Sequence, residues 1–117
     1  MNLRSLFNSS AASMPAVSVT EAKRKLDSGE AIVVDVREPN EWRQGHIAGA
    51  TLMPLSTLSS GFGSLPKDRE VLLICQSGNR SGVAQGFLAR AGFSSAINVQ
   101  GGMIAWQRHG LPMKAGK

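Results

Sequence analysis

Apolar residues in this chain form short runs that alternate between the spacing of strands and the spacing of helices. Runs rich in β-branched residues, or shorter apolar segments, predict strands at residues 17–19, 31–36, 51–53, 71–74 and 96–99. Helical spacing or helix-boundary residues predict helices at 20–29, 39–44, 80–90 and 102–109, with a weak helix or loop at 56–63. Repeated alternation of strand and helix predicts an α/β domain, in which about five mainly parallel strands are covered by helices on both faces.

Residues with special backbone preferences mark the ends of several predicted helices. Thr20 is a candidate N-cap of the first helix, and Gly29 can take the left-handed conformation that ends it. Pro39 fixes a helical φ at the start of the second helix. In the helix at 80–90, the spacing of apolar residues predicts one buried face, made of Val83, Ala84, Phe87, Leu88 and Ala91.

The strand at residues 71–74 runs directly into Cys75, and a polar loop then leads to the next helix. Unpaired backbone N–H groups and the positive end of a helix dipole converge in such a loop, which makes it a favourable anion site. Gly78 permits a turn that bulkier residues resist, and Arg80 adds a positive charge. Both features favour a thiolate, so we expect the pKa of Cys75 to fall from the usual value of about 8.5 to below neutrality. The loop residues are Gln76, Ser77, Gly78, Asn79, Arg80 and Ser81.

A lone cysteine is more commonly a small buried hydrophobic residue than a nucleophile. The polar loop argues against that interpretation for Cys75, because such residues directly after a buried strand serve no packing purpose. Asp35 and Arg37 lie at the end of the other long predicted strand. Ligands of parallel sheets bind at the carboxyl ends of the strands, so both residues are expected near the site.

Composition narrows the functional classes. The net charge is +5, but the thirteen Lys and Arg are dispersed and Tyr is absent, which disfavours nucleic-acid binding and favours attraction of small anions. No segment approaches the ~18 consecutive apolar residues of a membrane span. A single cysteine excludes an internal disulfide, and His46 and His109 are far apart, so we expect no metal site and no cofactor.

The chain is expected to form one domain. We predict a flexible arm at residues 1–14, a compact domain at 15–113 and a frayed tail at 114–117. The opening segment is too interrupted by polar residues for a secretory signal, so a cytoplasmic location is expected.

Four motifs follow one another along the chain. They are Val33-Val34-Asp35-Val36-Arg37 with Glu38 and Glu41, then Gly45-His46-Ile47-Ala48-Gly49-Ala50, then the loop 75–81, and finally Gly101-Gly102 with Trp106 and Gly110-Leu111-Pro112. Each motif is weak alone, but their order and spacing make a strong signal. Over about residues 16–113 the chain resembles the single-domain rhodaneses, a family of thiosulfate-type sulfurtransferases, and the resemblance implies a rhodanese-like three-layer fold.

The length of the loop separates relatives on this fold. The sulfurtransferases are similar in having a C-x4-R loop, sized for one extra sulfur atom, whereas related phosphatases and arsenate reductases have C-x5-R. Cys75 and Arg80 form C-x4-R here, and Ile74 stands where a phosphatase would have histidine. Both observations argue against a phosphatase or arsenate reductase, which is the first alternative function. A non-catalytic rhodanese-like interaction module is the second alternative.

The resemblance implies a double displacement. The Cys75 thiolate would take a sulfane sulfur from thiosulfate or another donor, and the resulting persulfide would pass it to cyanide or a thiol. The acceptor must come from outside the chain, which has no second cysteine. Expected partners are a small sulfur donor and a thiol acceptor, with a sulfur-relay protein as a further candidate and with no nucleic acid or membrane. We expect a monomer or a weak dimer.

The resemblance also implies supporting roles near the loop. The loop amides would stabilise the persulfide, and Arg80 would attract the donor and orient the loop. Asp35 is expected to brace the loop rather than act as a general base, and Arg37 to reach Glu41 or the pocket. His46 is expected to be structural, and Trp106 and Phe87 to belong to the core.

Overall fold

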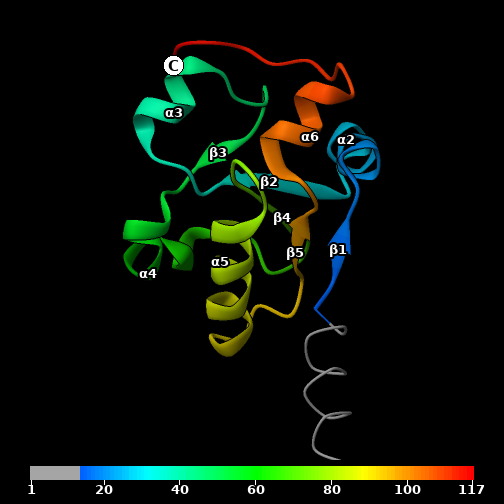
Figure 1. Ribbon diagram of the computed structural model, residues 1–117. Coiled ribbons are helices and arrows are strands. Elements are labelled where there is room, and N and C mark those ends of the chain that lie inside the picture. Colours follow the sequence, from blue (N-terminus) through cyan, green and yellow to red (C-terminus); the bar gives the residue numbers. More distant parts are fainter. Residues whose placement is uncertain (1–13) are drawn as a thin grey trace, which may run out of the picture.

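The computed structural model describes residues 14–117, so nearly all of the predicted arm lies outside the described residues. Within them, five parallel strands form one sheet in the order β1-β5-β4-β2-β3 (Figure 1). This topology confirms the predicted α/β fold with a parallel sheet. The strands are β1 (Ala16–Val17), β2 (Ala31–Asp35), β3 (Thr51–Leu52), β4 (Glu70–Ile74) and β5 (Ala96–Val99).

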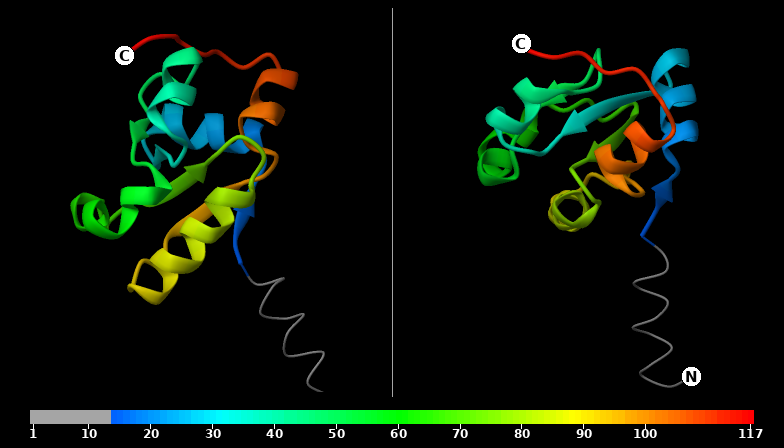
Figure 2. Two further views of the ribbon diagram at one scale, coloured as in Figure 1. Left: turned by 60° about the vertical axis from the view of Figure 1, so that its left-hand side comes forward. Right: turned by 45° about the horizontal axis from the view of Figure 1, so that its top comes forward.

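Helices cover both faces of the sheet (Figures 1 and 2). Alternate residues of β4 point to opposite faces, so Val71 and Leu73 pack in one core cluster while Leu72 and Ile74 pack in the other. α4 and α5 contribute to the first cluster, and α2 and α6 to the second. The helices are α2 (Val19–Ser28), α3 (Pro39–Gln44), α4 (Leu58–Gly61), α5 (Asn79–Arg90) and α6 (Gly102–Arg108), with 3-10 turns η1 (Leu55–Thr57) and η2 (Phe62–Ser64).

Two predictions about helix boundaries and faces are wrong. The N-cap of α2 is Ser18, whose hydroxyl accepts from the Glu21 N–H, rather than Thr20. Consequently Val19 belongs to the helix and not to β1. On α5, Val83 is 62% exposed, and Ala91 at the end of the helix is exposed too, whereas Gln85 is buried. Its side-chain amide donates to two backbone carbonyls and satisfies its polar group in the interior.

The final segment of the chain runs from α6 across to α3 (Figure 1). Trp106, buried as expected, donates its ring N–H to the Pro112 carbonyl. Lys114 then pairs with His46 through two backbone hydrogen bonds, and the Gly116 N–H donates to the Arg43 carbonyl. The segment predicted to be a frayed tail is thus fastened to the end of α3. No helix within residues 14–117 is long and apolar enough to cross a membrane.

Candidate active site

Cys75 follows the last residue of β4, the central strand of the sheet, and is 1% exposed. The chain turns at Gly78, whose φ of 106° lies in the left-handed region that favours glycine. α5 begins at the next residue. The loop is therefore held between a buried strand and a helix N-terminus, as the sequence predicts.

The backbone of the loop wraps around the Cys75 sulfur. The N–H groups of Gly78 and Ser81 lie 3.1 and 3.3 Å from Sγ, respectively, and both point at it. The Ser81 hydroxyl lies 3.3 Å from the same sulfur. Donors that converge on one atom stabilise negative charge there.

Two opposing influences act on the pKa of the Cys75 thiol. Burial raises the pKa, since it disfavours the charged form. Hydrogen bonds from the Ser81 side chain and from the backbone of Ser81, Gly78 and Ser77 lower it. The hydrogen bonds outweigh burial, and the pKa of Cys75 is lowered, in the direction that the sequence predicts.

The start of α6 supports the loop from its other side. The Met103 N–H donates to the Cys75 carbonyl at 2.8 Å, and the Ile104 N–H donates to the Gln76 carbonyl at 3.1 Å. Gly102 permits this approach, because a Cβ atom there would lie 2.3 Å from the Cys75 carbonyl oxygen. The Gly101-Gly102 motif therefore has a specific structural role: it lets the backbone at the start of α6 pack directly against the backbone of the loop.

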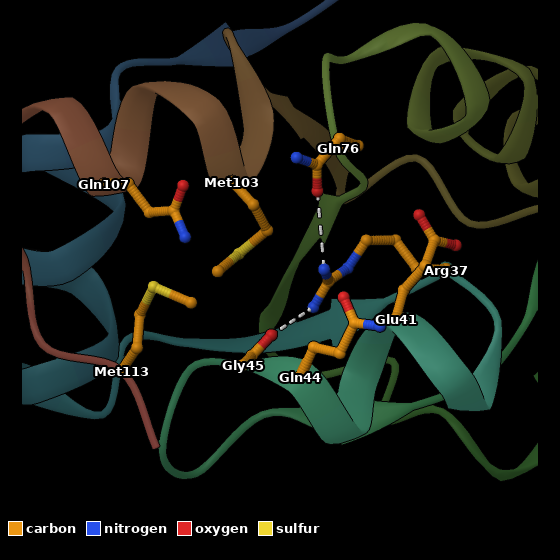
Figure 3. Close-up of a pocket in the computed structure, with 8 residues that line it drawn as sticks. All are labelled: Arg37, Glu41, Gln44, Gly45, Gln76, Met103, Gln107 and Met113. Carbon is orange, nitrogen blue, oxygen red and sulfur yellow. Dashed lines mark hydrogen bonds between the residues drawn. The ribbon is translucent and has the colours of Figure 1, made fainter. Parts of the chain in front are cut away.

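Asp35 and Arg37 form a buried ion pair beside the loop. Arg37 Nη2 lies 2.8 Å from Asp35 Oδ2, and the side chains are 5% and 1% exposed, respectively. Arg37 also donates to the Gly45 carbonyl at 2.7 Å and to the Gln76 side-chain oxygen at 3.4 Å (Figure 3). Within residues 14–117 the Asp35 side chain hydrogen-bonds only Arg37, which in turn links β2, the end of α3 and Gln76.

Arg80 pairs with Glu41 of α3 rather than standing free over the sulfur. Its two terminal nitrogens lie 2.7 and 2.9 Å from the two carboxylate oxygens. The hydrogen bonds from Arg80 lower the pKa of Glu41 to about 2, despite partial burial. Of the two expectations for Arg37, the structure favours the pocket: Arg37 lines the cavity described below, whereas no hydrogen bond joins it to Glu41 within residues 14–117. The pair of Arg80 and Glu41 fastens the first turn of α5 to α3.

Asn98 of β5 is a site residue that the sequence analysis missed. Its side-chain oxygen lies 2.6 Å from the Ser81 hydroxyl, and its side-chain nitrogen donates to the Gly78 carbonyl at 3.3 Å. A polar residue within the apolar run 96–99, near the carboxyl end of the strand beside β4, was the available signal.

The remaining predicted residues lie around the site. Ser77 and Asn79 are exposed on the loop. His46 is buried away from solvent, stacks on Trp42 with ring centroids 3.6 Å apart, and bonds the Trp42 carbonyl through Nδ1. These contacts agree with a structural interpretation of His46.

A cavity of about 400 Å³ opens beside Gln76, between α3, α6 and the final segment of the chain (Figure 3). Three glutamine side chains and two methionines contribute to its wall, and both nearby cations already have carboxylate partners. The lining is therefore rich in amide groups and thioethers rather than in free charge. The lining residues are Arg37, Glu41, Gln44, Gly45, Gln76, Met103, Gln107 and Met113.

Comparison with known proteins points to one family. Residues 18–109 match the Rhodanese-like domain. A protein of Allochromatium vinosum named "Sulfurtransferase" is 39% identical over 94 residues, which cover 80% of this chain and 88% of that protein. The "Putative sulfur carrier protein YrkF" of Bacillus subtilis is 37% identical over 97 residues, which cover 82% of this chain but only 52% of that protein.

Longer relatives and solved structures agree with this match. The "Probable adenylyltransferase/sulfurtransferase MoeZ" of Mycobacterium tuberculosis is 42% identical over 105 residues, which cover 87% of this chain and 27% of that protein. A rhodanese-related protein from Thermoplasma volcanium superposes with a TM-score of 0.80 at 31% identity, covering 86% of this chain and 97% of the other. A rhodanese-like domain protein from Staphylococcus aureus gives 0.75 at 35% identity, covering 87% and 100%, respectively.

Proposed function

The chain belongs to the family of rhodanese-like domains, and we propose that it is a sulfurtransferase that carries a sulfane sulfur on Cys75. One observation carries the proposal: two backbone N–H groups and a hydroxyl converge on the buried Sγ atom. Such a cradle stabilises the thiolate that must attack the donor and that is regenerated when the acceptor takes the sulfur.

The reaction has two displacement steps in which charge is conserved. The Cys75 thiolate attacks the outer sulfur of thiosulfate, the new S–S bond forms, and sulfite leaves with the electrons of the old S–S bond. An acceptor thiolate or cyanide then attacks the terminal sulfur of the persulfide, and the Cys75 thiolate is regenerated. The acceptor is external because the chain contains one cysteine.

The engagement of Arg80 favours sulfur transfer over chemistry on a phosphate or arsenate. A tetrahedral oxyanion needs several donors aimed at its oxygens, and an arginine fork is the usual source of two of them. Here both terminal nitrogens of Arg80 donate to Glu41. This pairing and the four-residue spacing between Cys75 and Arg80 support a loop that holds a sulfur atom.

The cavity beside Gln76 supports a thiol acceptor that carries amide groups. Cyanide and thiosulfate need far less room than about 400 Å³. The side chains of Gln44, Gln76 and Gln107 can hydrogen-bond peptide groups, and Met103 and Met113 can pack against a thiol-bearing chain. The relatives named as a sulfur carrier and a sulfurtransferase are consistent with an acceptor that passes the sulfur on.

Intact-protein mass spectrometry tests the proposal. Protein treated with thiosulfate should gain one sulfur atom, and cyanide should remove that atom and yield thiocyanate. Cys75→Ser should gain none. If the folded protein acquires no sulfur from thiosulfate or from a low-molecular-weight persulfide, the proposal fails. Turnover of a phosphoester or arsenate would then favour the alternative enzyme, and biological activity retained by Cys75→Ala would favour an interaction module.

A further inference from the structure

The Ser81 hydroxyl lies between two groups that can each accept its proton. Its oxygen is 3.3 Å from the Cys75 sulfur and 2.6 Å from the side-chain oxygen of Asn98. A hydroxyl has one proton, so it can donate to only one of these partners at a time.

The orientation of the Asn98 amide follows from its second contact. The Gly78 carbonyl, 3.3 Å away, can only accept a hydrogen bond, so the amide nitrogen must face it. The amide oxygen must then face Ser81, and because a carbonyl oxygen has no proton, Ser81 must donate. In this arrangement, a lone pair of the hydroxyl is available to the Cys75 thiol, which can donate its own proton to Ser81.

Loss of the thiol proton breaks this arrangement. The charged sulfur is poorly placed beside a hydroxyl lone pair, so the hydroxyl must rotate and donate to Sγ. Asn98 then loses the partner of its side-chain oxygen, and an unpaired polar group in this part-buried site disfavours the new state. Asn98 and the thiolate therefore compete for the same proton.

We propose that Asn98 is a positioning residue that draws the Ser81 hydroxyl proton away from the Cys75 sulfur and thereby restrains the free thiolate. A persulfide relieves the competition, because its charge resides on the terminal sulfur and Sγ needs no donor. The hydrogen bond between Ser81 and Asn98 would thus disfavour the free thiolate relative to the persulfide. The inference deepens the proposed function, since it concerns the same sulfur, but its test needs no sulfur donor.

Other charged groups near the loop are paired and do not replace this contact. Arg80 of α5 is bound to Glu41 of α3, and Arg37, just beyond β2, is bound to Asp35. The positive charge of Arg80 acts on the Cys75 thiolate through space. Since these pairs are unchanged by substitutions at Asn98, a change in Cys75 titration would report on the hydroxyl.

The test is the pH dependence of alkylation of Cys75 by iodoacetamide. The chain has one cysteine, so the rate reports on this thiol alone. Asn98→Leu removes the competing acceptor and should raise the ratio of thiolate to thiol roughly tenfold at a given pH, the size expected for one hydrogen bond to a charged group. Ser81→Ala should lower the ratio. In the Ser81→Ala background, Asn98→Leu should have a much smaller effect, because only the bond from Asn98 to the Gly78 carbonyl remains to be lost.

Asn98→Asp provides an isosteric second test. A carboxylate holds the hydroxyl proton more strongly than an amide and also repels the thiolate through space, so this variant should lower the ratio of thiolate to thiol. Ser81→Ala should remove the part of that effect that the hydroxyl carries. Thermal melting verifies that each variant is folded, and if Asn98→Leu does not fold, the pair of Asp variants decides. The proposal would be overturned if a substitution at Asn98 changed the ratio of thiolate to thiol equally with and without the Ser81 hydroxyl. A lower ratio in Asn98→Leu than in the unmodified protein would also overturn it.

Discussion

Substitution of Gly102 by alanine tests whether the start of α6 holds the loop that follows Cys75. The φ angle of Gly102 is +57°, and an added Cβ would lie 2.3 Å from the Cys75 carbonyl oxygen and 2.7 Å from the carbonyl carbon and oxygen of Gln76. These neighbours are backbone atoms, which cannot move aside by changing a rotamer. The Met103 and Ile104 N–H groups donate to these same two carbonyls, so relief of the clash must lengthen both hydrogen bonds.

Gly110 is a matched control for the backbone strain alone. Its φ angle is +65°, but an added Cβ would meet no heavy atom within 4 Å. Alanine in the left-handed region costs about 1–2 kcal/mol, which is the full expected loss for Gly110→Ala. Overpacking adds about 1–3 kcal/mol, so Gly102→Ala should lose roughly 2–5 kcal/mol.

Two measurements separate these effects. Urea unfolding gives the loss of stability, and iodoacetamide alkylation gives the reactivity of Cys75 in the folded protein. We expect Gly102→Ala to lose more stability than Gly110→Ala and to change the alkylation rate, whereas Gly110→Ala should leave the rate unchanged. Equal stability losses, or an unchanged rate in folded Gly102→Ala, would refute the reasoning that this contact positions the loop.

Three further predictions concern the ion pairs and the cavity. Asp35→Asn should destabilise the fold by about 3–5 kcal/mol in urea unfolding, because it leaves the Arg37 charge buried without a counterion, and Asp35→Asn with Arg37→Met should recover part of the loss. The lowered pKa of Glu41 adds stability above pH 4.5 that is lost as the pH falls toward about 2. In acid-unfolding curves of Glu41→Gln, the free energy of unfolding should therefore change less between pH 4.5 and about 2 than it does in the unmodified protein. The difference should be less than about 1 kcal/mol, because the pair is partly exposed. Gln107→Ala should raise KM for a peptide thiol acceptor and leave KM for cyanide unchanged in steady-state assays; equal changes would contradict an acceptor site in the cavity.

The sequence predicted the elements whose signals are local. Unbroken apolar runs identified the two long central strands, and the abrupt change to polar residues after Cys75 located the loop. Gly78 has the positive φ that the turn requires. These features depend on neighbouring residues and on the backbone, so the pattern of about ten consecutive residues is enough to predict them.

Contacts between distant segments could not be predicted in the same way. Arg80 meets Glu41 across 39 positions, and Ser81 meets Asn98 across 17. The periodicity of α5 predicted burial of Val83, but Val83 lies on the exposed face of the helix. A glutamine, Gln85, is buried instead and donates to two backbone carbonyls. Side-chain partners of this kind depend on how the elements pack, which hydrophobic spacing does not specify.

The position of Cys75 on the central strand explains how its charge is supported. β5 and β2 flank β4, so Asn98 braces the loop from one side and Arg37 from the other, while α6 donates two N–H groups to the loop carbonyls. These contacts use neutral dipoles or a cation that already has a carboxylate partner. The proposed reaction begins and ends with one negative charge on sulfur, so dipoles suffice for both states. In the proposed reaction an unpaired arginine would also bind the departing sulfite dianion, so the pairing of Arg80 with Glu41 would favour its release.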